Sequence, residues 1–306
     1  MYDVAVFGSI NLDVTAMCNE YPNGGDTVFI KSVGMAPGGK GNNQAAAANK
    51  QGARVAFVGA VGQDAQGTQM LDNLRAAGIE TSRILVDPEH STGTAVCIVD
   101  GTGENTILVA NGVNLEVPAA HVTESLADVD AKVLLVQMET SRESILEALR
   151  MGREKGMLCV LDPAPADGFF PEALQYADLV LPNTQETERI TGIAVRTQED
   201  ALAAAKKIEE LGVSRSVVKM GGGGCLVYEN GQATFVPAMQ VKAVDTVGAG
   251  DTFAGGLAAE YARTGDLVAS VRYGTVKAGL KVAAGSGHAS SPTQEKVREV
   301  LSDIEW

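Results

Sequence analysis

A short segment near the end of the chain combines small residues with an acidic one: Gly248, Ala249, Gly250 and Asp251, within "AVDTVGAGDTF". Small residues at the start of a helix leave several backbone N–H groups pointing at one spot, beside the positive end of the helix dipole, where an anion binds. Phosphoryl transfer to an alcohol needs such a spot next to a carboxylate, which accepts the hydroxyl proton. Asp251 could equally serve as a helix cap, and this segment alone leaves both interpretations open.

A second glycine-rich segment, "PGGKGNNQAAAA", begins at Pro37. It has some features of a phosphate-binding loop, but the Walker motif requires G-x-x-x-x-G-K-[ST], in which the hydroxyl binds magnesium. Here Lys40 is followed by Gly41, Asn42 and Asn43, so the hydroxyl is missing. The segment therefore does not match that motif, and its lysine and asparagines are available to another ligand.

The elements that must position these segments follow from the apolar pattern. Short apolar runs include "VAVFG", "VAFVG", "VLLVQM", "LCVLDP", "LVLPN" and "SVVKMG". Amphipathic stretches such as 64–77, 141–155 and 198–211 lie between them. This alternation predicts a single α/β domain over 1–306, with a mostly parallel central sheet flanked by helices. In such folds ligands bind beyond the carboxyl ends of the strands.

Two segments, 14–34 and 91–111, interrupt this alternation. Both contain β-branched runs around Gly, Asn and Asp turns, and the second is typical of a hairpin with "DGTGEN" at its tip. Because no helix accompanies either segment, we expect a small separate β-sheet that forms a lid over the ligand edge. Apolar strands without helical cover invite pairing, so we expect a homodimer in which two lids cover each other.

Composition excludes several classes of partner. The 306-residue chain has a formal net charge of −14, which disfavours binding to nucleic acid or to an anionic membrane surface. The four cysteines lie far apart without a C-x-x-C pair, as is usual for reduced thiols. The N-terminal segment lacks a basic leader, and no apolar run approaches the ~18 residues of a membrane helix. We therefore expect a cytoplasmic protein without a membrane partner.

Four motifs occur in a recognisable order: "GSINLD", "GGKGNNQA", "PNTQETE" and "DTVGAGDTF". In order and spacing they resemble the ribokinase family of sugar kinases, also called PfkB carbohydrate kinases, over nearly the whole chain. The resemblance implies an α/β core with a β-sheet lid, often paired in a dimer. It also implies ATP-dependent, magnesium-supported phosphorylation of a sugar hydroxymethyl group.

The resemblance assigns the first glycine segment to the sugar. The implied sugar-binding residues are Asn11, Asp13, Gly39, Lys40, Asn43, Glu139 and Asp251. Asp251 would be the general base, and Gly248, Ala249 and Gly250 would form the anion hole. Singly, Lys40 could be a solvated loop lysine and Asn11 a turn residue. As a set that follows strands at one sheet edge, these residues favour a sugar site.

The nucleotide side is assigned in the same way. Asn183 and Glu186 match the family's N-x-x-E motif, which is associated with the magnesium-phosphate network, although Asn183 could simply cap a helix. The implied ATP-binding residues are Asn183, Glu186, Lys219, Gly221, Gly224, Gly250 and Thr275. The glycines after Lys219 would let a loop lie along the triphosphate.

A monovalent cation site, with potassium as activator, is also implied beside the anion hole. Its residues would be Asp245, Val247, Lys281, Ala284, Gly287 and Ser291, contributing mostly carbonyl groups. An ion behind the glycine segment would orient the amide dipoles without contacting the substrate.

The same residues disfavour two other functions. An NAD oxidoreductase requires G-x-G-x-x-G after the first strand, where this chain has "GSINLD". A sugar sensor without catalysis would be expected to lose Asp251 or its flanking glycines. A kinase of the same family with another acceptor, such as deoxyribose, another sugar or a nucleoside, remains the alternative. Because Lys40 is nearly alone as a cation near the acceptor, we expect a neutral sugar. The resemblance to the family implies that this sugar is a pentose, D-ribose, phosphorylated on its terminal hydroxymethyl oxygen.

Overall fold

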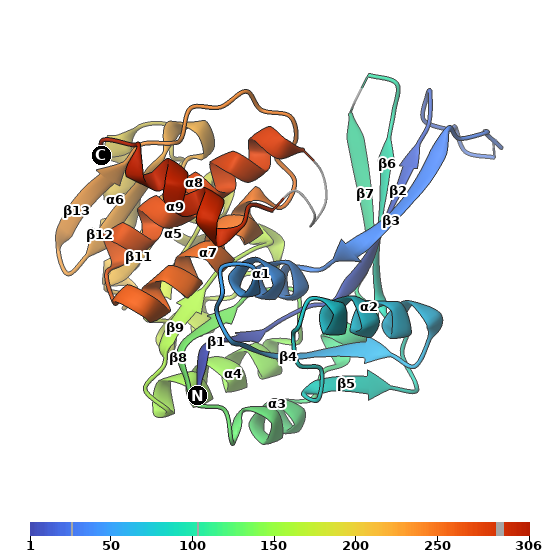
Figure 1. Cartoon of the computed structure of the whole chain (residues 1–306), viewed down its shortest axis with the longest axis horizontal. Coiled ribbons are helices and arrows are strands. Elements are labelled where there is room, and N and C mark those ends of the chain that lie inside the picture. Colours follow the sequence, from blue (N-terminus) through green and yellow to red (C-terminus); the bar gives the residue numbers. More distant parts are fainter. Residues whose placement is uncertain (26, 103, 286–290) are drawn as a thin grey trace.

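A computed structural model describes residues 1–25, 27–102, 104–285 and 291–306. Within these residues the chain forms a large α/β body and a small sheet that projects from it (Figure 1). The expected fold class is therefore confirmed. None of the described helices is both long and apolar enough to span a membrane.

The central sheet has nine strands among the described residues, in the spatial order β13-β12-β11-β10-β9-β8-β1-β4-β5. Its strands are β1 (Tyr2–Phe7), β4 (Val55–Gly62), β5 (Ile84–Asp87), β8 (Ala131–Val136), β9 (Leu158–Leu161), β10 (Leu179–Val180), β11 (Arg215–Lys219), β12 (Cys225–Glu229) and β13 (Gln232–Val236). Neighbouring strands from β5 to β11 pair in parallel, and β12 pairs antiparallel with both β11 and β13. All six apolar runs noted in the sequence lie on strands of this sheet.

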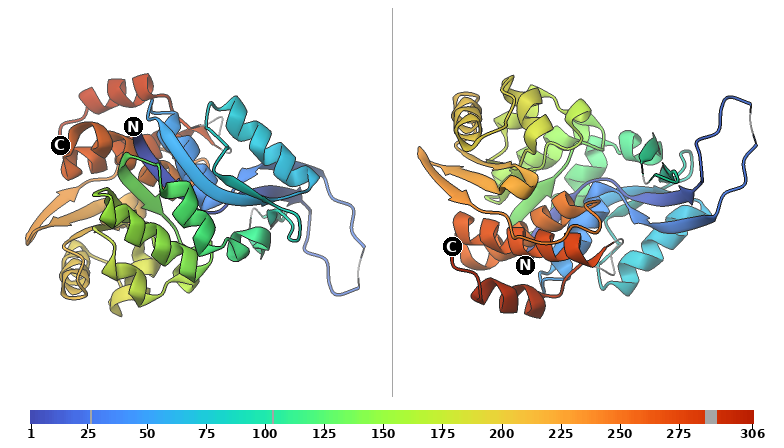
Figure 2. Two further views of the ribbon diagram at one scale, coloured as in Figure 1. Left: turned by 90° about the horizontal axis from the view of Figure 1, so that it is seen from below. Right: turned by 90° about the horizontal axis from the view of Figure 1, so that it is seen from above.

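Helices cover both faces of the sheet (Figures 1 and 2). On one face lie α1 (Lys40–Asn49), α2 (Ala65–Ala76), α7 (Ala249–Thr264) and α8 (Leu267–Ala284), with α9 (Gln294–Ser302) packed outside α8. On the other face lie α3 (Ala119–Leu126), α4 (Arg142–Glu154), α5 (Thr184–Thr191) and α6 (Gln198–Glu210). Short 3₁₀ turns occur at η1 (Gly112–Glu116), η2 (Ala166–Gly168), η3 (Pro171–Gln175) and η4 (Gly221–Gly223).

The two-faced packing explains the continuous apolar strands. On β1, Val4 and Val6 pack into the core beneath α1 and α7, while Ala5 and Phe7 pack into the core beneath α3 and α4. Successive side chains of a strand point to opposite faces, so a strand covered on both sides must be apolar throughout.

The small sheet has the strand order β3-β2-β6-β7, formed by β2 (Asn11–Met17), β3 (Ser32–Gly38), β6 (Gly93–Val99) and β7 (Asn105–Ala110). It contacts α1 and α2 and projects from the body beyond them (Figure 1). We call it the lid sheet. Its first pair of strands extends beyond the expected 14–34, because β2 begins at Asn11 and β3 ends at Gly38. Asn11 and Asp13 thus belong to a lid strand and not to a connection after β1.

Candidate active site

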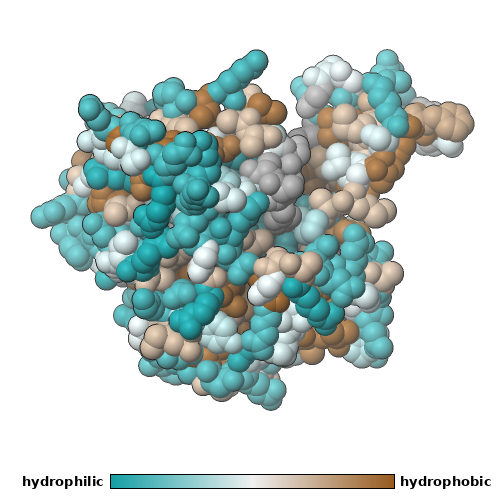
Figure 3. All heavy atoms as spheres, viewed as in Figure 1, coloured by the Kyte–Doolittle hydropathy of each residue, from teal (hydrophilic) through white to brown (hydrophobic). Residues whose placement is uncertain are grey.

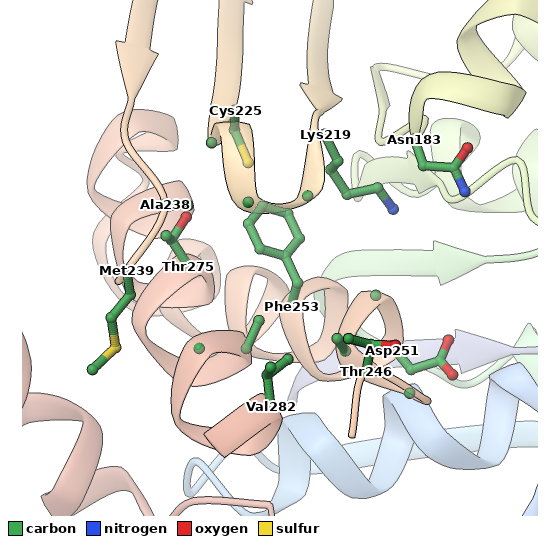
Figure 4. A pocket seen from close by; sticks show the side chains of 18 of the residues that line it. Asn183, Lys219, Cys225, Ala238, Met239, Thr246, Asp251, Phe253, Thr275 and Val282 are labelled. Carbon is green, nitrogen blue, oxygen red and sulfur yellow. The ribbon is translucent and has the colours of Figure 1, made fainter. Parts of the chain in front are cut away.

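A cavity of about 700 Å³ lies between the β11–β12 connection and the helices α7 and α8 (Figure 4). It reaches the carboxyl ends of β9, β10 and β11, where the fold class predicts ligand binding. Every residue expected to bind ATP lines it: Asn183, Glu186, Lys219, Gly221, Gly224, Gly250 and Thr275. Lys40, Gly248, Ala249 and Asp251 line the same cavity, so the structure brings the expected nucleotide and catalytic residues together.

The glycine segment before α7 turns sharply into the helix. Gly248 is the N-cap with a left-handed φ of 73°, which glycine adopts without strain. The N–H of Ala249 donates to the Thr246 carbonyl at 3.2 Å, and the first bond of the helix runs from Thr252 to Gly248. Among the described residues, the N–H groups of Gly250 and Asp251 have no protein acceptor. These two amides, and not that of Ala249, are available to an anion.

Asp251 is buried, with 8% of its surface exposed, and its carboxylate does not cap α7. Its two oxygens instead accept hydrogen bonds from Asn43 Nδ2 at 3.1 Å and Gln44 Nε2 at 3.0 Å. Burial raises the pKa of Asp251, and the negative charge of Asp162 raises it further, while Lys40 and the two amides act against the increase. A carboxylate with a raised pKa accepts a proton more readily near neutral pH.

Gln44 connects Asp251 to a second buried carboxylate. Its Nε2 also donates to Asp162 Oδ2 at 2.8 Å, and its Oε1 accepts from Gln137 Nε2 at 2.7 Å. Both hydrogens of the amide group are therefore used by carboxylates, and Gln137 holds the amide in that orientation. No role was expected for Gln44, Gln137 or Asp162. The available signal was that Gln44 lies in "GGKGNNQA" and the other two directly follow β8 and β9.

Lys219, at the end of β11, donates from Nζ to Asp162 Oδ1 at 3.0 Å. Burial opposes the charge of this ammonium group, but the attraction of Asp162 and Glu186 outweighs burial and raises the pKa of Lys219. One oxygen of Asp162 thus accepts from the ammonium group of Lys219, and its other oxygen accepts from the amide of Gln44. Figure 4 shows Lys219 and Asn183 directed towards the same end of the cavity.

Asn183 and Glu186 form a capping box at the start of α5. The Glu186 carboxylate accepts from the Asn183 N–H at 2.7 Å and from Asn183 Nδ2 at 2.8 Å, and Asn183 Oδ1 accepts from the Glu186 N–H at 2.9 Å. Burial raises the pKa of Glu186, while Lys219 opposes the increase. The alternative that Asn183 caps a helix is therefore correct. A nucleotide role is compatible with it, because both residues line the cavity.

Lys40 lies at the centre of a cluster of carboxylates. Its burial works against a positive charge, but Asp251, Glu139, Asp162 and Glu186 together raise its pKa. Its backbone N–H donates to Glu139 Oε2 at 3.1 Å, which fixes the glutamate beside the first turn of α1. A solvated loop lysine would not have these surroundings.

Asp13, on β2, belongs to the same cluster. Burial, followed by the charges of Glu139 and Asp251, raises the pKa of Asp13 to about 6, against the effect of Lys40. Asn11 is buried nearby, and its Oδ1 accepts from Asn114 Nδ2 at 2.8 Å. The expected sugar residues are therefore brought together, although the side chains of Asn11 and Asn43 also bind protein groups.

The glycines before α1 are required by the protein itself. A Cβ on Gly38 would lie 2.0 Å from Asp13 Oδ1, and a Cβ on Gly39, whose φ is +84°, would lie 2.7 Å from the Ser9 carbonyl oxygen. The atoms that exclude a side chain at these two positions belong to Asp13 and to the β1–β2 turn.

The expected cation site contains a charged group of the protein. Lys281 Nζ donates to the Gly285 carbonyl at 2.9 Å and lies 3.6 Å from Asp245 Oδ2. Val247 is largely exposed and Ala284 lies on an exposed part of α8. Ser291 is partly buried, and Gly287 lies outside the described residues. Because an ammonium group already faces the Asp245 carboxylate, the described members of this set do not fit an added potassium ion, contrary to expectation.

Comparison with known proteins agrees with the fold. The model of the pfkB family of carbohydrate kinases matches residues 1–294, and the chain belongs to this family. It is 32% identical over 299 residues to a ribokinase of Haemophilus influenzae, covering 97% of this chain and 98% of that protein. It is 33% identical over 304 residues to a deoxyribokinase of Salmonella typhi, covering 98% and 99%.

Among solved structures, the ribokinase of Arabidopsis thaliana in complex with ribose and ATP superposes with a TM-score of 0.90. Its sequence identity is 26%, and 98% of each chain is covered. These comparisons confirm an ATP-dependent carbohydrate kinase of the ribokinase type.

Proposed function

We propose that this protein transfers the γ-phosphoryl group of ATP to the terminal hydroxymethyl oxygen of D-ribose. The observation that carries the proposal is the position of Asp251. It lies in the wall of the nucleotide cavity and is hydrogen-bonded to α1, the helix that begins with Lys40. A hydroxyl beside Asp251 would therefore face a phosphate in the cavity.

In the proposed reaction, Asp251 accepts the hydroxyl proton as the sugar oxygen bonds to the γ-phosphorus. The bond from that phosphorus to the β,γ-bridging oxygen breaks, and ADP leaves. The free amides of Gly250 and Asp251 stabilise the negative charge on the moving phosphoryl group, and Lys40 neutralises charge on the acceptor side. Among the described lining residues, Lys219 is held by Asp162, and Lys40 is attracted by the carboxylates around it. Both charges are therefore in the cavity wall before the substrates bind.

Magnesium would accompany ATP and neutralise charge on its phosphates. The ion is usually bound through one or two carboxylates together with phosphate oxygens and water, so it needs no cage of protein ligands. Glu186, with Asn183, lies in the cavity wall and would face it. This agrees with the finding that the described residues contain no group of three or more His, Cys, Asp or Glu able to hold a metal by themselves.

On the sugar side, Asp13 and Glu139 supply carboxylate acceptors for ring hydroxyls, and Asn11 adds an amide on the same strand as Asp13. In the described part of the chain, Lys40 is the cation that acts on Asp13 and Asp251, which favours a neutral sugar over a sugar phosphate. The similarity to a deoxyribokinase makes 2-deoxyribose the second candidate. We further propose that the lid sheet closes over the sugar and pairs with the lid of a second copy.

The test is ADP release measured with D-ribose, 2-deoxyribose, D-fructose and a nucleoside, each with magnesium-ATP. A hydroxyl missing from a buried site leaves its protein partner unpaired, so kcat/KM for 2-deoxyribose should be about 10- to 100-fold below that for ribose. Asp251→Asn tests the general base. It should lower kcat by about 10²- to 10⁴-fold while ribose still binds. Faster turnover of 2-deoxyribose or of the nucleoside would reject D-ribose and leave only the family assignment.

A further inference from the structure

The C-terminal end of α8 carries a buried ammonium group directly behind the glycine segment. Lys281 has 4% of its surface exposed and reaches towards the C-terminal end of the helix, where the Gly285 carbonyl lies 2.9 Å from Nζ. Its second neighbour is the carboxylate of Asp245, at 3.6 Å. A buried charge is tolerated when it is paired in this way, so the pair is a built part of the fold.

The Lys281–Asp245 pair is connected to the residues that lead into α7. Asp245 Oδ1 accepts from the Val247 N–H at 2.9 Å, one residue before the N-cap Gly248. The Val282 carbonyl accepts from the N–H groups of Val244 and Asp245 at 2.9 and 3.2 Å. The turn that sets the direction of the Gly250 and Asp251 amides is thus attached to α8 at Val282 and through Lys281.

We propose that the Lys281 ammonium group takes the place of a monovalent cation behind the anion site, so that this protein works without potassium. An ammonium group has the charge of a potassium ion and a similar size. It also uses the same kind of ligands, a carbonyl at a helix C-terminus and a carboxylate. A second cation at this position would meet the charge of Lys281, which repels it.

The proposal rests on the proposed function, because the amides that Lys281 positions are those assigned to the phosphoryl group. Lys281 acts through Asp245 and the turn and does not touch a substrate, so it is a positioning residue. A tethered cation is always present, whereas a free ion must be bound from solution. The chain would therefore not depend on the ionic composition of its surroundings.

The experiment compares ADP release in potassium chloride and in tetramethylammonium chloride at equal ionic strength, for the parent and for Lys281→Met. Methionine has nearly the length of lysine but lacks the ammonium group, so the variant removes the positive charge beside the Asp245 carboxylate and keeps most of the side-chain volume. We expect equal rates in both salts for the parent. For Lys281→Met we expect a lower rate in tetramethylammonium and an increase of about tenfold on adding potassium.

The melting temperature supplies a readout that does not depend on turnover. A ligand that binds only the folded state stabilises it by mass action, so potassium should raise the Tm of Lys281→Met and leave that of the parent unchanged. Lys277→Met is the matched control. It removes another buried lysine of α8, one turn earlier, whose Nζ donates to the Ala47 carbonyl at 2.8 Å, and it should gain no potassium response.

A parent that is activated or stabilised by potassium overturns the proposal, as does a Lys281→Met variant with the parent rate in both salts. If Lys281→Met does not fold, the neutral Lys281→Gln takes its place, and the parent comparison stands without any variant. A parent that releases no ADP with any acceptor would instead reject the proposed function. The Tm comparison would then still decide whether Lys281 occupies the cation position.

Discussion

At the scale of single residues, the candidate active site contains one amide group that is shared between two carboxylates. Gln44 donates both amide hydrogens, one to Asp251 and one to Asp162, and Gln137 keeps it in that orientation. The two carboxylates therefore influence each other through charge and through a common partner. The charged groups that act on Asp251 are Lys40 from α1, Asp162 after β9, Asp13 from β2 and Lys219 from β11.

This arrangement predicts opposite pH shifts for two substitutions. Asp162 raises the pKa of Asp251, so Asp162→Asn should lower it and move the acid limb of kcat/KM to lower pH. The Gln44 amide lowers the pKa of Asp251, so Gln44→Met should move the same limb to higher pH and reduce kcat by about 10- to 100-fold. The measurement is kcat/KM for the sugar as a function of pH in each protein.

Asp178→Asn is the control, because it also removes one carboxylate but at a position away from the cavity. Asp178 directly precedes β10, and its carboxylate accepts a hydrogen bond from the Cys159 N–H. Its acid limb should coincide with that of the parent. Parallel shifts for Asp162→Asn and Gln44→Met would mean that the acid limb does not report Asp251.

At the scale of secondary structure, α8 buries a second lysine without a carboxylate. Lys277 is fully buried, and its Nζ donates to the carbonyl of Ala47 near the end of α1. Its side chain passes over α7 at Gly256, where a Cβ would lie 2.7 Å from Lys277 Cδ. Lys277 thus joins α1, α7 and α8, the helices around the site, while burial lowers its pKa to about 7.

This lowered pKa predicts a pH-dependent stability. Between pH ~7 and ~10.4 the unfolded chain holds a proton on Lys277 that the folded chain has released, so the contribution of this residue to stability rises with pH across that window. Below about pH 7 its destabilising effect is fully present. The free energy of unfolding should gain up to about 1.4 kcal/mol per pH unit in the parent relative to Lys277→Met.

Urea unfolding of both proteins at several pH values between 6 and ~10 measures this difference, since other titrating groups are common to both. Parallel curves for the parent and Lys277→Met would show that Lys277 stays charged in the folded protein.

At the scale of the whole molecule, the lid sheet exposes apolar side chains on both faces. Register places Ile107 and Val109 on the face of Asp13, whereas Val33, Met35 and Leu108 lie on the opposite face. All five are more than half exposed, and Figure 3 shows hydrophobic residues gathered on the projecting lid. Closure of the lid over the sugar would cover only the Asp13 face. The other face would remain apolar and exposed, which favours a second copy as its cover.

We therefore expect a homodimer at micromolar concentration in sedimentation experiments. Met35→Lys combined with Leu108→Lys should convert it to a monomer, because the substitutions place charges in the pairing face. Ile107→Lys, on the same strand but on the Asp13 face, is the matched control and should leave the dimer intact. A monomeric parent, or a dimer unaffected by the paired substitutions, would contradict the lid as the interface.

The elements, and the sheet edge at which the candidate site lies, could be predicted from residue types and their spacing. Apolar runs without alternation could only be strands covered on both faces, and the intervening amphipathic stretches could only be the covering helices. The small residues from Gly248 to Gly250 and the acidic residue after them predicted a helix start with free amides. These features are local, so periodicity and residue type are sufficient to recognise them.

The tertiary structure alone decided which side chains meet. Gln44 and Asp162 are 118 residues apart, and Gln44 and Asp251 are 207 apart, so no local pattern indicates that one amide joins both carboxylates. Likewise, the sequence resemblance predicted that Lys281 is one of several residues around a bound ion. Only the fold shows that its ammonium group lies against Asp245. Charge and hydrogen bonding act through space over a few ångströms, and only the packing of α1, α7 and α8 on the sheet brings these groups within that range.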